Sequence, residues 1–358
     1  YLQHPNRGGG DGFLYPAGVI SPRSFVQGVF MQIRIIGLAH RLGSTIIEAE
    51  AIEQHFKRDP GTIAALSGVS RLHRIAEHED LVILSREACI DALSRAEVPL
   101  SRVNGIFTSC NPTTDYLIPS LAPLVAQKLD ITHVMAINIG MGCAGGVQAL
   151  QAAYNQCIVD AHNGKTSYYL VVAGDHTSRM LDKESWKTAI LFSDGVSAAV
   201  VTNDPAARGG FVVERVTSET YAGESVDVIN LPNCLALEPG TPRSATLLHM
   251  RGRGVFEFGT RIAPRVKHLT GFTSFDDCYI IPHQANIRML NELVPNLGIR
   301  EDQLYRDGIT RIGNISGAAC FLGLEDAQKR GLTNRARNVL LCAFGAELQV
   351  AVAILTHG

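Results

Sequence analysis

Three polar side chains of this chain have the types and surroundings that thioester chemistry needs. Cys143 follows the short apolar segment 134–139, within the glycine-rich turn GMGCAGG. His283 follows the apolar segment 278–281, and Asn314 lies in the turn GNISGAA. A thiolate attacks a thioester well, and a histidine and an amide can donate hydrogen bonds to the oxygen that becomes negative. We therefore treat the three residues as one candidate catalytic set.

The segment around Cys143 predicts a strand, a tight turn and a helix. Residues 134–139 are mostly apolar and bounded by glycine, as in a buried strand of a parallel sheet. Apolar residues then recur at helical spacing over residues 147–161. Cys143 should therefore stand at, or just before, the first turn of a helix. Unpaired N–H groups and the helix dipole favour negative charge there, and such a place lowers the pKa of a thiol.

The same turn allows two other interpretations. It matches the G-x-G-x-x-G pattern of nicotinamide and flavin sites, which expects an acidic residue about 20 residues on, near the end of the next strand. Asp160 has that spacing but falls inside the predicted helix, and the next strand ends only at Asp175. Alternatively, Cys143 simply packs, as most free cysteines do. The partners at 283 and 314 favour the nucleophile.

The composition is that of an ordinary globular protein of 358 residues, with 46% hydrophobic and 18% charged residues. A formal net charge of −2 gives no general reason to expect nucleic-acid binding. No apolar segment reaches the roughly 20 residues that span a bilayer. The eight cysteines form no C-x-x-C pair, and no H-E-x-x-H pattern occurs. These features predict reduced thiols, a cytoplasmic location, and neither a metal nor a cofactor.

The elements that must position the three residues alternate along the chain. Residues 1–31 predict an extension or tag-like leader, and a seam at 203–210 divides the remainder into two similar halves, 32–204 and 205–358. The alternation predicts an α/β fold with a mostly parallel sheet. We expect strands at 33–38, 103–109, 134–139, 168–173, 196–201, 211–217, 278–281, 339–342 and 348–355 and helices at 46–56, 81–96, 120–129, 143–161, 253–269, 285–297 and 318–330.

The order of these motifs resembles a known family. Cys143, His283 in PHQANIR and Asn314 in GNISGAA, with TTDYLIP before them and AFGAE after, are similar to β-ketoacyl-acyl-carrier-protein synthase III of the thiolase superfamily. The likeness extends from about residue 32 to residue 355. It implies a five-layered αβαβα fold of two similar halves and a homodimer. It also implies acyl transfer from acyl-CoA to Cys143, followed by decarboxylative condensation with malonyl-acyl carrier protein.

The residue types are consistent with that chemistry. Backbone N–H groups near Cys143 and near Ala346 can hold the oxyanion that forms during acyl transfer. In the second step decarboxylation generates an enolate, whose oxygen needs donors, and His283 and Asn314 can both donate. An aspartate at 314 would present an acceptor instead. The asparagine therefore favours carbon–carbon bond formation over simple acyl transfer.

The resemblance also implies surfaces for the substrates. It places the coenzyme A or carrier-protein entrance near residues 66–74, near Arg288 and on the helix that begins at Arg253. The loop at 114–118 would reach the acyl pocket of the partner subunit. A basic patch at residues 251–267, in which Arg261 and Arg265 are four residues apart, suits phosphates or an acidic carrier. The candidate binding residues are Arg71, Arg74, Arg253, Arg261 and Arg288, and the loop residues are Thr114, Tyr116 and Leu117.

Two rival functions remain open at this point. An acyltransferase of the same fold would move the acyl group from Cys143 to a hydroxyl or amine and release no carbon dioxide. A catalytically silent subunit would be expected to have lost at least one of the three site residues, and this chain has lost none. The acyl chain length, the pathway that receives the product, and homodimer versus heterodimer are not determined by the sequence.

Overall fold

The computed structural model describes residues 25–26, 29–140, 142–221, 228–238, 240–345 and 348–358. Most of the predicted leader 1–31 lies outside these residues, apart from two short strands, β1 (Phe25–Val26) and β2 (Val29–Phe30). Ala346, the predicted second oxyanion donor, also lies outside them.

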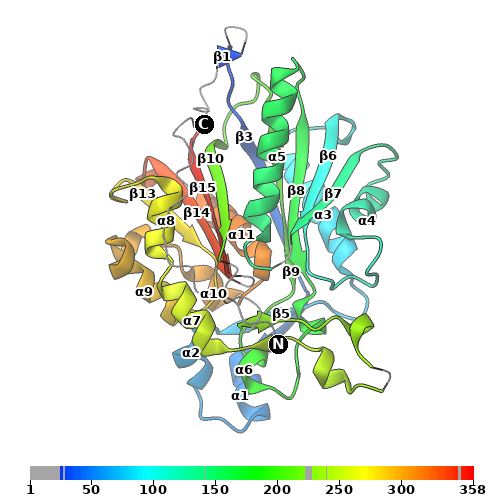
Figure 1. Cartoon of the computed structure of the whole chain (residues 1–358), viewed down its shortest axis with the longest axis vertical. Coiled ribbons are helices and arrows are strands. Elements are labelled where there is room, and N and C mark those ends of the chain that lie inside the picture. Colours follow the sequence, from blue (N-terminus) through cyan, green and yellow to red (C-terminus); the bar gives the residue numbers. More distant parts are fainter. Residues whose placement is uncertain (1–24, 27–28, 141, 222–227, 239, 346–347) are drawn as a thin grey trace, which may run out of the picture.

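Nine strands of the described chain join in one sheet (Figure 1). Their order is β13 (Cys278–Pro282), β14 (Asn338–Gly345), β15 (Gln349–His357), β10 (Phe211–Thr220), β3 (Arg34–Leu42), β9 (Gly195–Thr202), β8 (Tyr168–Asp175), β6 (Val103–Ser109) and β7 (Met135–Gly140). Parallel pairs occur at β13–β14, β6–β8 and β6–β7, and the other pairs are antiparallel.

The two ends of this sheet repeat one pattern. The order β6-β8-β9-β3 matches β13-β14-β15-β10, and in both runs the first pair is parallel and the next two are antiparallel. The two runs are joined through β10 and β3, where Phe211 and Val212 pair with Ile35 and Arg34. The predicted seam at 203–210 lies in the connection between β9 and β10. The division into domains at 204/205 stays a prediction.

Helices complete five layers. The middle layer is α5 (Gly145–His162) with α11 (Ala319–Lys329), whose apolar faces share a core with strands of both runs. One outer layer is α3 (Leu81–Arg95) with α4 (Leu121–Lys128), and the other includes α8 (Ala263–Thr270) and α9 (Ile287–Leu297). Figure 1 shows α5 and α11 between the outer helices. The predicted αβαβα fold is confirmed.

Two expectations about the sheet were wrong. The sheet is mixed, because β8 to β9 and β14 to β15 fold back as antiparallel neighbours, which alternation of apolar segments cannot distinguish from crossovers. The predicted buried strand at 134–139 is β7, an edge strand that exposes Met135 (38%), Ile137 (41%) and Ile139 (37%). Its continuous apolar pattern therefore does not indicate burial within a single chain.

Two predicted helices also differ. Residues 253–269 form two helices, α7 (Gly252–Thr260) and α8, because Pro264 has no N–H to continue the hydrogen-bond ladder across the junction. Residues 46–56 begin as strand β4 (Thr45–Glu48), paired with β5 (Arg71–Arg74), before α1 (Ala49–His55). The remaining elements are α2 (Thr62–Ser67), α6 (Trp186–Ala189), α10 (Asp307–Arg311), β11 (Ile229–Asn230) and β12 (His249–Met250).

Among the described residues, the helices are too short or too polar for any of them to cross a membrane.

Candidate active site

Cys143 lies where the sequence predicts, in the turn between β7 and α5. It stands two residues before Gly145, the first residue of α5, and its side chain is partly exposed. Gly142 before it has φ +77°, a conformation that L side chains rarely adopt. The N–H of Gly145 donates to the carbonyl of Gly142 (3.2 Å), which closes the turn. The thiol is thereby presented at the start of an 18-residue helix, where the dipole favours negative charge.

The other glycines of this turn allow close packing. A Cβ on Gly145 would lie 1.9 Å from the Ser109 hydroxyl oxygen, and one on Gly146 would lie 2.3 Å from the carbonyl oxygen of Gly317. Gly317 belongs to the turn that carries Asn314. Two glycines of the G-x-G-x-x-G pattern are therefore explained by the fold, Gly145 by its contact with Ser109 and Gly142 by its positive φ. Asp160 accepts a hydrogen bond from the hydroxyl of Tyr169.

His283 follows β13 directly and is 2% exposed. Its N–H donates to the carbonyl of Cys342 (2.8 Å), which extends the pairing with β14, and its ring meets Phe344 edge to face at 5.8 Å between centroids. Its Nδ1 atom is buried and has no hydrogen-bond partner among the described residues. Burial lowers the pKa of His283 to about 4, so the ring is neutral at physiological pH.

Asn314 makes three hydrogen bonds with neighbouring backbone groups. Its backbone N–H donates to the carbonyl of Leu191 (2.9 Å), and its carbonyl accepts from the N–H of Ser193 (2.8 Å). Its side-chain oxygen accepts from the N–H of Ser316 (2.9 Å). Because that contact uses the oxygen, the amide nitrogen of Asn314 is left to donate. The turn follows α10 rather than a strand, so its likeness to the other two junctions is limited to the helix that comes after it.

One cavity brings the three residues together. It measures about 130 Å³, and Cys143, His283 and Asn314 all line it. The rest of its wall is mainly apolar, with aromatic rings and two methionines: Phe192, Met250, Phe256, Phe258, Met289 and Phe344. Gly345 stands so close to Cys143 that a Cβ there would lie 2.9 Å from the sulfur. The cavity therefore joins a thiol to two neutral hydrogen-bond donors in apolar surroundings.

Known proteins share both this sequence and this fold. Residues 137–219 match the family 3-Oxoacyl-[acyl-carrier-protein (ACP)] synthase III, and residues 269–357 match 3-Oxoacyl-[acyl-carrier-protein (ACP)] synthase III C terminal. The β-ketoacyl-[acyl-carrier-protein] synthase III of Clostridium beijerinckii is 29% identical over 90% of this chain and 98% of its own. The Thermus thermophilus synthase III structure has a TM-score of 0.77 at 26% identity, covering 91% of this chain and 99% of that one.

The chain thus resembles 3-oxoacyl-[acyl-carrier-protein] synthase III in both halves, and it is a synthase III-like enzyme of the thiolase superfamily. The prediction of a condensing acyltransferase of the thiolase superfamily is thus confirmed at the level of family, fold and enzyme class. A type III pentaketide synthase of Neurospora crassa shares the fold alone, with a TM-score of 0.74 at 18% identity over 91% of this chain and all of that one.

The predicted binding residues of this synthase III-like chain are spread over its surface. Arg253 and Arg288 are exposed, and each adjoins a residue of the cavity wall, Gly252 and Met289 respectively. Arg261 is exposed at the end of α7 and does not share a helix with Arg265. Arg265 instead lies over the rings of Tyr221 (3.7 Å) and Phe258 (4.6 Å). The expected single basic helix face is therefore wrong.

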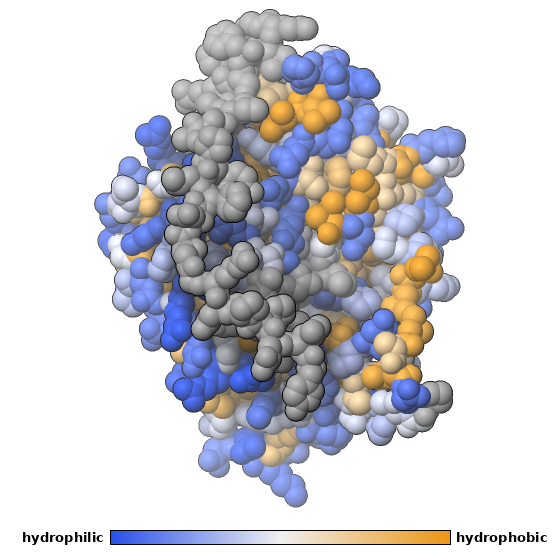
Figure 2. All heavy atoms as spheres, viewed as in Figure 1, coloured by the Kyte–Doolittle hydropathy of each residue, from blue (hydrophilic) through white to orange (hydrophobic). Residues whose placement is uncertain are grey.

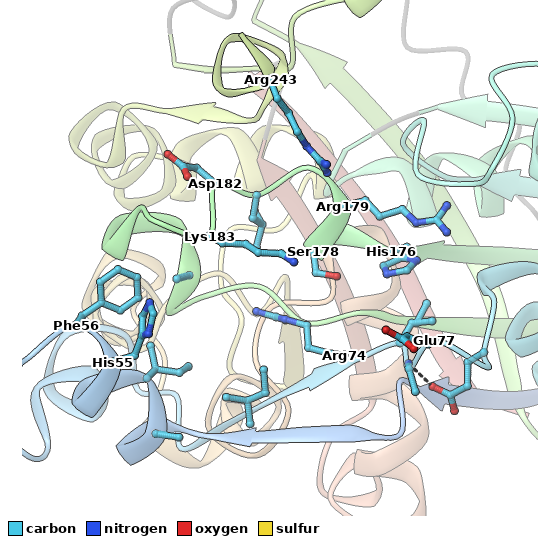
Figure 3. A pocket seen from close by; sticks show the side chains of 18 residues that line it. His55, Phe56, Arg74, Glu77, His176, Ser178, Arg179, Asp182, Lys183 and Arg243 are labelled. Atoms are coloured by element: carbon cyan, nitrogen blue, oxygen red, sulfur yellow. Dashed lines mark hydrogen bonds between the residues drawn. The ribbon is translucent and has the colours of Figure 1, made fainter.

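Arg74 belongs to a second, larger pocket of about 640 Å³, and Cys143 is not among the described residues that line it (Figure 3). Arg74 donates to the carbonyl of Phe192, so the wall between the two spaces is formed partly by residues 189–192. Figure 3 shows Arg179, Lys183 and Arg243 around the same pocket. Arg71 is exposed and pairs with Glu48 at 3.7 Å. These two arginines therefore lie outside the Cys143 cavity.

The loop with Thr114, Tyr116 and Leu117 lies on the surface of the chain. Tyr116 is 59% and Leu117 52% exposed, and the hydroxyl of Thr114 donates to the carbonyl of Tyr116 (2.7 Å). The salt bridge between Asp115 and Arg179 (2.7 Å) holds the base of the loop. The loop takes no part in the cavity of its own chain.

Sequence reasoning missed the residues that support the site. Asp175 is used in the sequence only as an argument against a dinucleotide site, yet its carboxylate contacts both the 111–113 loop and Ser316. The signal was available, because a carboxylate ends an otherwise apolar strand at the edge where Cys143 also lies. Of the apolar wall residues, Met250 lies between the predicted strand 211–217 and the predicted helix 253–269, and Phe256 lies within that helix, which was considered only for its basic residues.

Proposed function

We propose that this protein catalyses a decarboxylative Claisen condensation, in which an acyl group moves from acyl-CoA to Cys143 and is then joined to malonyl-acyl carrier protein. The observation that carries the proposal is the single cavity shared by the Cys143 thiol, the ring of His283 and the amide of Asn314. No base is needed to remove a proton from carbon in this reaction, and neither of the two partner side chains is charged.

In the first step the Cys143 sulfur attacks the thioester carbonyl. A new carbon–sulfur bond forms at Cys143, the bond to the coenzyme A sulfur breaks, and coenzyme A leaves as a thiol. One thioester replaces another, so the exchange is nearly neutral in free energy. The carbonyl oxygen becomes negative during the attack, and backbone N–H groups near Cys143 are suitable donors. A donor from Ala346 remains part of the proposal.

In the second step the malonyl carboxylate leaves as carbon dioxide, and its bonding electrons pass to the adjacent carbon as an enolate. His283 through a ring N–H and Asn314 through its amide N–H stabilise the enolate oxygen. The carbon then attacks the acyl group on Cys143, a carbon–carbon bond forms, and the Cys143 thiolate is released. Because the pKa of His283 is held at about 4, its donor is that of a neutral imidazole.

A homodimer is part of the proposal. In the described chain the edge strand β7 pairs on one side only, and three of its apolar side chains are more than a third exposed. Figure 2 shows apolar surface on the side where β7 and α4 lie in Figure 1. A second copy could pair with this edge and cover it, and the loop at 114–118 would then extend toward the partner. Unpaired strand edges with apolar side chains favour such association.

Carrier-protein docking is assigned to Arg253, Arg261 and Arg288. All three arginines are exposed. Arg253 and Arg288 are each next in sequence to a residue that lines the cavity. An acidic carrier would be attracted to these charges, and the attraction should weaken as salt is raised. Arg71 and Arg74 keep a proposed role with the phosphates of coenzyme A, which would have to approach from the side of the larger pocket.

Intact-mass measurement after incubation with a panel of acyl-CoA thioesters tests the first step, and addition of malonyl-acyl carrier protein tests the second. We expect a mass increase at Cys143, followed by release of carbon dioxide and a 3-oxoacyl product. Acylation without carbon dioxide release, together with transfer to an added alcohol or amine, would replace condensation by simple acyl transfer. Absence of acylation with every thioester would overturn both enzyme functions.

A further inference from the structure

A buried carboxylate lies between the two turns that carry Cys143 and Asn314. Asp175 is the last residue of β8 and is 2% exposed. Within the described residues its partners are all donors: the backbone N–H of Asn111 (2.7 Å), the side-chain amide of Asn111 (2.9 Å), the hydroxyls of Thr113 (3.5 Å) and Ser316, and the thiol of Cys110. Burial raises the pKa of Asp175 to about 6, and the hydrogen bonds oppose that rise.

One set of contacts leads to the nucleophile. Asn111 donates to Asp175 through both its backbone and its side-chain amide, which fixes the orientation of that amide. The remaining side-chain oxygen of Asn111 then accepts from the N–H of Gly142 (3.1 Å). Gly142 precedes Cys143 and has the left-handed conformation that turns the chain. The carboxylate thus determines, through one intermediate side chain, where the thiol is placed.

The other set leads to the enolate donor. Ser316 hydrogen-bonds to the carboxylate through its hydroxyl, and its backbone N–H donates to the side-chain oxygen of Asn314. Ser316 has φ +52°, an unfavourable conformation for a residue with a Cβ, so its backbone is held there by its surroundings. That conformation directs the amide nitrogen of Asn314 away from Ser316.

We propose that Asp175 is a positioning residue that holds the Cys143 turn and the Asn314 turn in one fixed arrangement. Its catalytic consequence rests on the function proposed above. A carboxylate suits this role because it offers only acceptors, whereas an amide would place its own N–H groups against the donors of Asn111 or Ser316. The two turns also touch directly, with Gly146 packed against Gly317.

The test replaces Asp175 by asparagine, which keeps the size of the side chain. We expect Asp175→Asn to slow both the acylation of Cys143 and the condensation roughly ten- to a hundredfold, with little change in the KM for acyl-CoA. Both rates are divided by the fraction of the protein that can be acylated. Backbone amides of residues 138–150 and 312–319 should exchange hydrogen for deuterium faster. Single-arm variants should separate the effects: Asn111→Ala should slow mainly acylation, and Ser316→Ala mainly condensation.

Glu325→Gln is the matched control. Glu325 is also buried (3% exposed), but it pairs with His40, Arg95 and Lys329 away from the cavity. The Glu325→Gln variant should lower thermal stability. It should leave the acylation rate, the condensation rate and the hydrogen–deuterium exchange of the two turns unchanged. Wild-type rates and unchanged exchange in Asp175→Asn would overturn the proposal, as would single-arm variants that slow both steps equally.

The two proposals fail in distinguishable ways. If the wild-type protein is never acylated, the proposed condensing function is wrong. Hydrogen exchange in the two turns still shows whether Asp175 holds them in place. If Asp175→Asn does not fold, the single-arm variants decide, because each alters one partner of the carboxylate. Selective slowing of one step by each of them supports the positioning role, and identical behaviour contradicts it.

Discussion

The two similar halves of the sheet contribute different chemistry to one cavity. The chain before β10 supplies Cys143 from a turn whose shape depends on backbone conformation, with Gly142 left-handed and Gly145 and Gly146 in close contact with neighbours. The chain from β10 onward supplies His283 and Asn314, which are held by hydrogen bonds and ring packing. A repeated architecture therefore allows covalent chemistry on one side and non-covalent stabilisation on the other, since each junction can change its side chain independently.

The largest effect is expected from a variant that removes the thiol of Cys143, the nucleophile in this comparison. Cys143→Ser should lower acyl transfer by at least about a thousandfold, because a hydroxyl is a much weaker nucleophile than a thiolate near neutral pH. Intact-mass analysis after incubation with acyl-CoA measures the loss. Cys157→Ala on the same helix is the control and should acylate normally, since Cys157 is buried in the core and outside the cavity. Acylation lost equally in both variants would contradict the assignment.

Removing a donor from the other half should separate the two steps. Asn314→Ala should acylate within about threefold of wild type but condense a hundred- to a thousandfold more slowly, the typical cost of one oxyanion donor. Single-turnover measurement of each step provides the comparison. If a well-folded Asn314→Ala protein also failed to acylate, the division of labour between the halves would be wrong.

The contact between the halves can be broken by one methyl group. Gly146→Ala would place a Cβ 2.3 Å from the Gly317 carbonyl oxygen, so we expect a loss of about 1–3 kcal/mol in unfolding free energy and slower rates in both steps. Gly254→Ala on α7 is the control, because its Cβ would meet only Val228 at 3.4 Å. Chemical denaturation compares the two. Equal stability would show that the turns do not need this approach.

The smallest effect concerns pH and the second half alone. The pKa of His283 is about 4 in the folded protein, below the ordinary value of 6.5, so between these values the unfolded chain binds more protons. The contribution of His283 to stability is therefore present above about pH 6.5 and is lost as pH falls toward 4, by at most about 1.4 kcal/mol per pH unit. Denaturation of wild type and His283→Gln across this range should show a difference that narrows in acid. A constant difference would contradict a buried neutral imidazole.

Much of the site could be predicted from particular residues. Cys143, His283 and Asn314 were proposed together because each alone has an ordinary structural explanation, whereas the three at similar junctions form a recognised catalytic set. The binding arginines could not be placed in this way. Arg265 shows why. Helical spacing pairs it with Arg261, but the chain divides into α7, which ends at Thr260, and α8, whose first turn contains Pro264. Two aromatic rings lie against the Arg265 guanidinium. Surface charge has no periodicity that distinguishes a binding site from a solvated face.

The sequence alone determined most of the elements, a candidate catalytic set and the family resemblance, because apolar periodicity and turn residues act over a few neighbouring positions. Only the tertiary structure decided the rest. It showed that the sheet is mixed, that β7 is an exposed edge, and that Asp175 connects two turns. Such features depend on which segments meet across the fold, and contacts between residues 111, 142, 175 and 316 leave no local pattern in the chain.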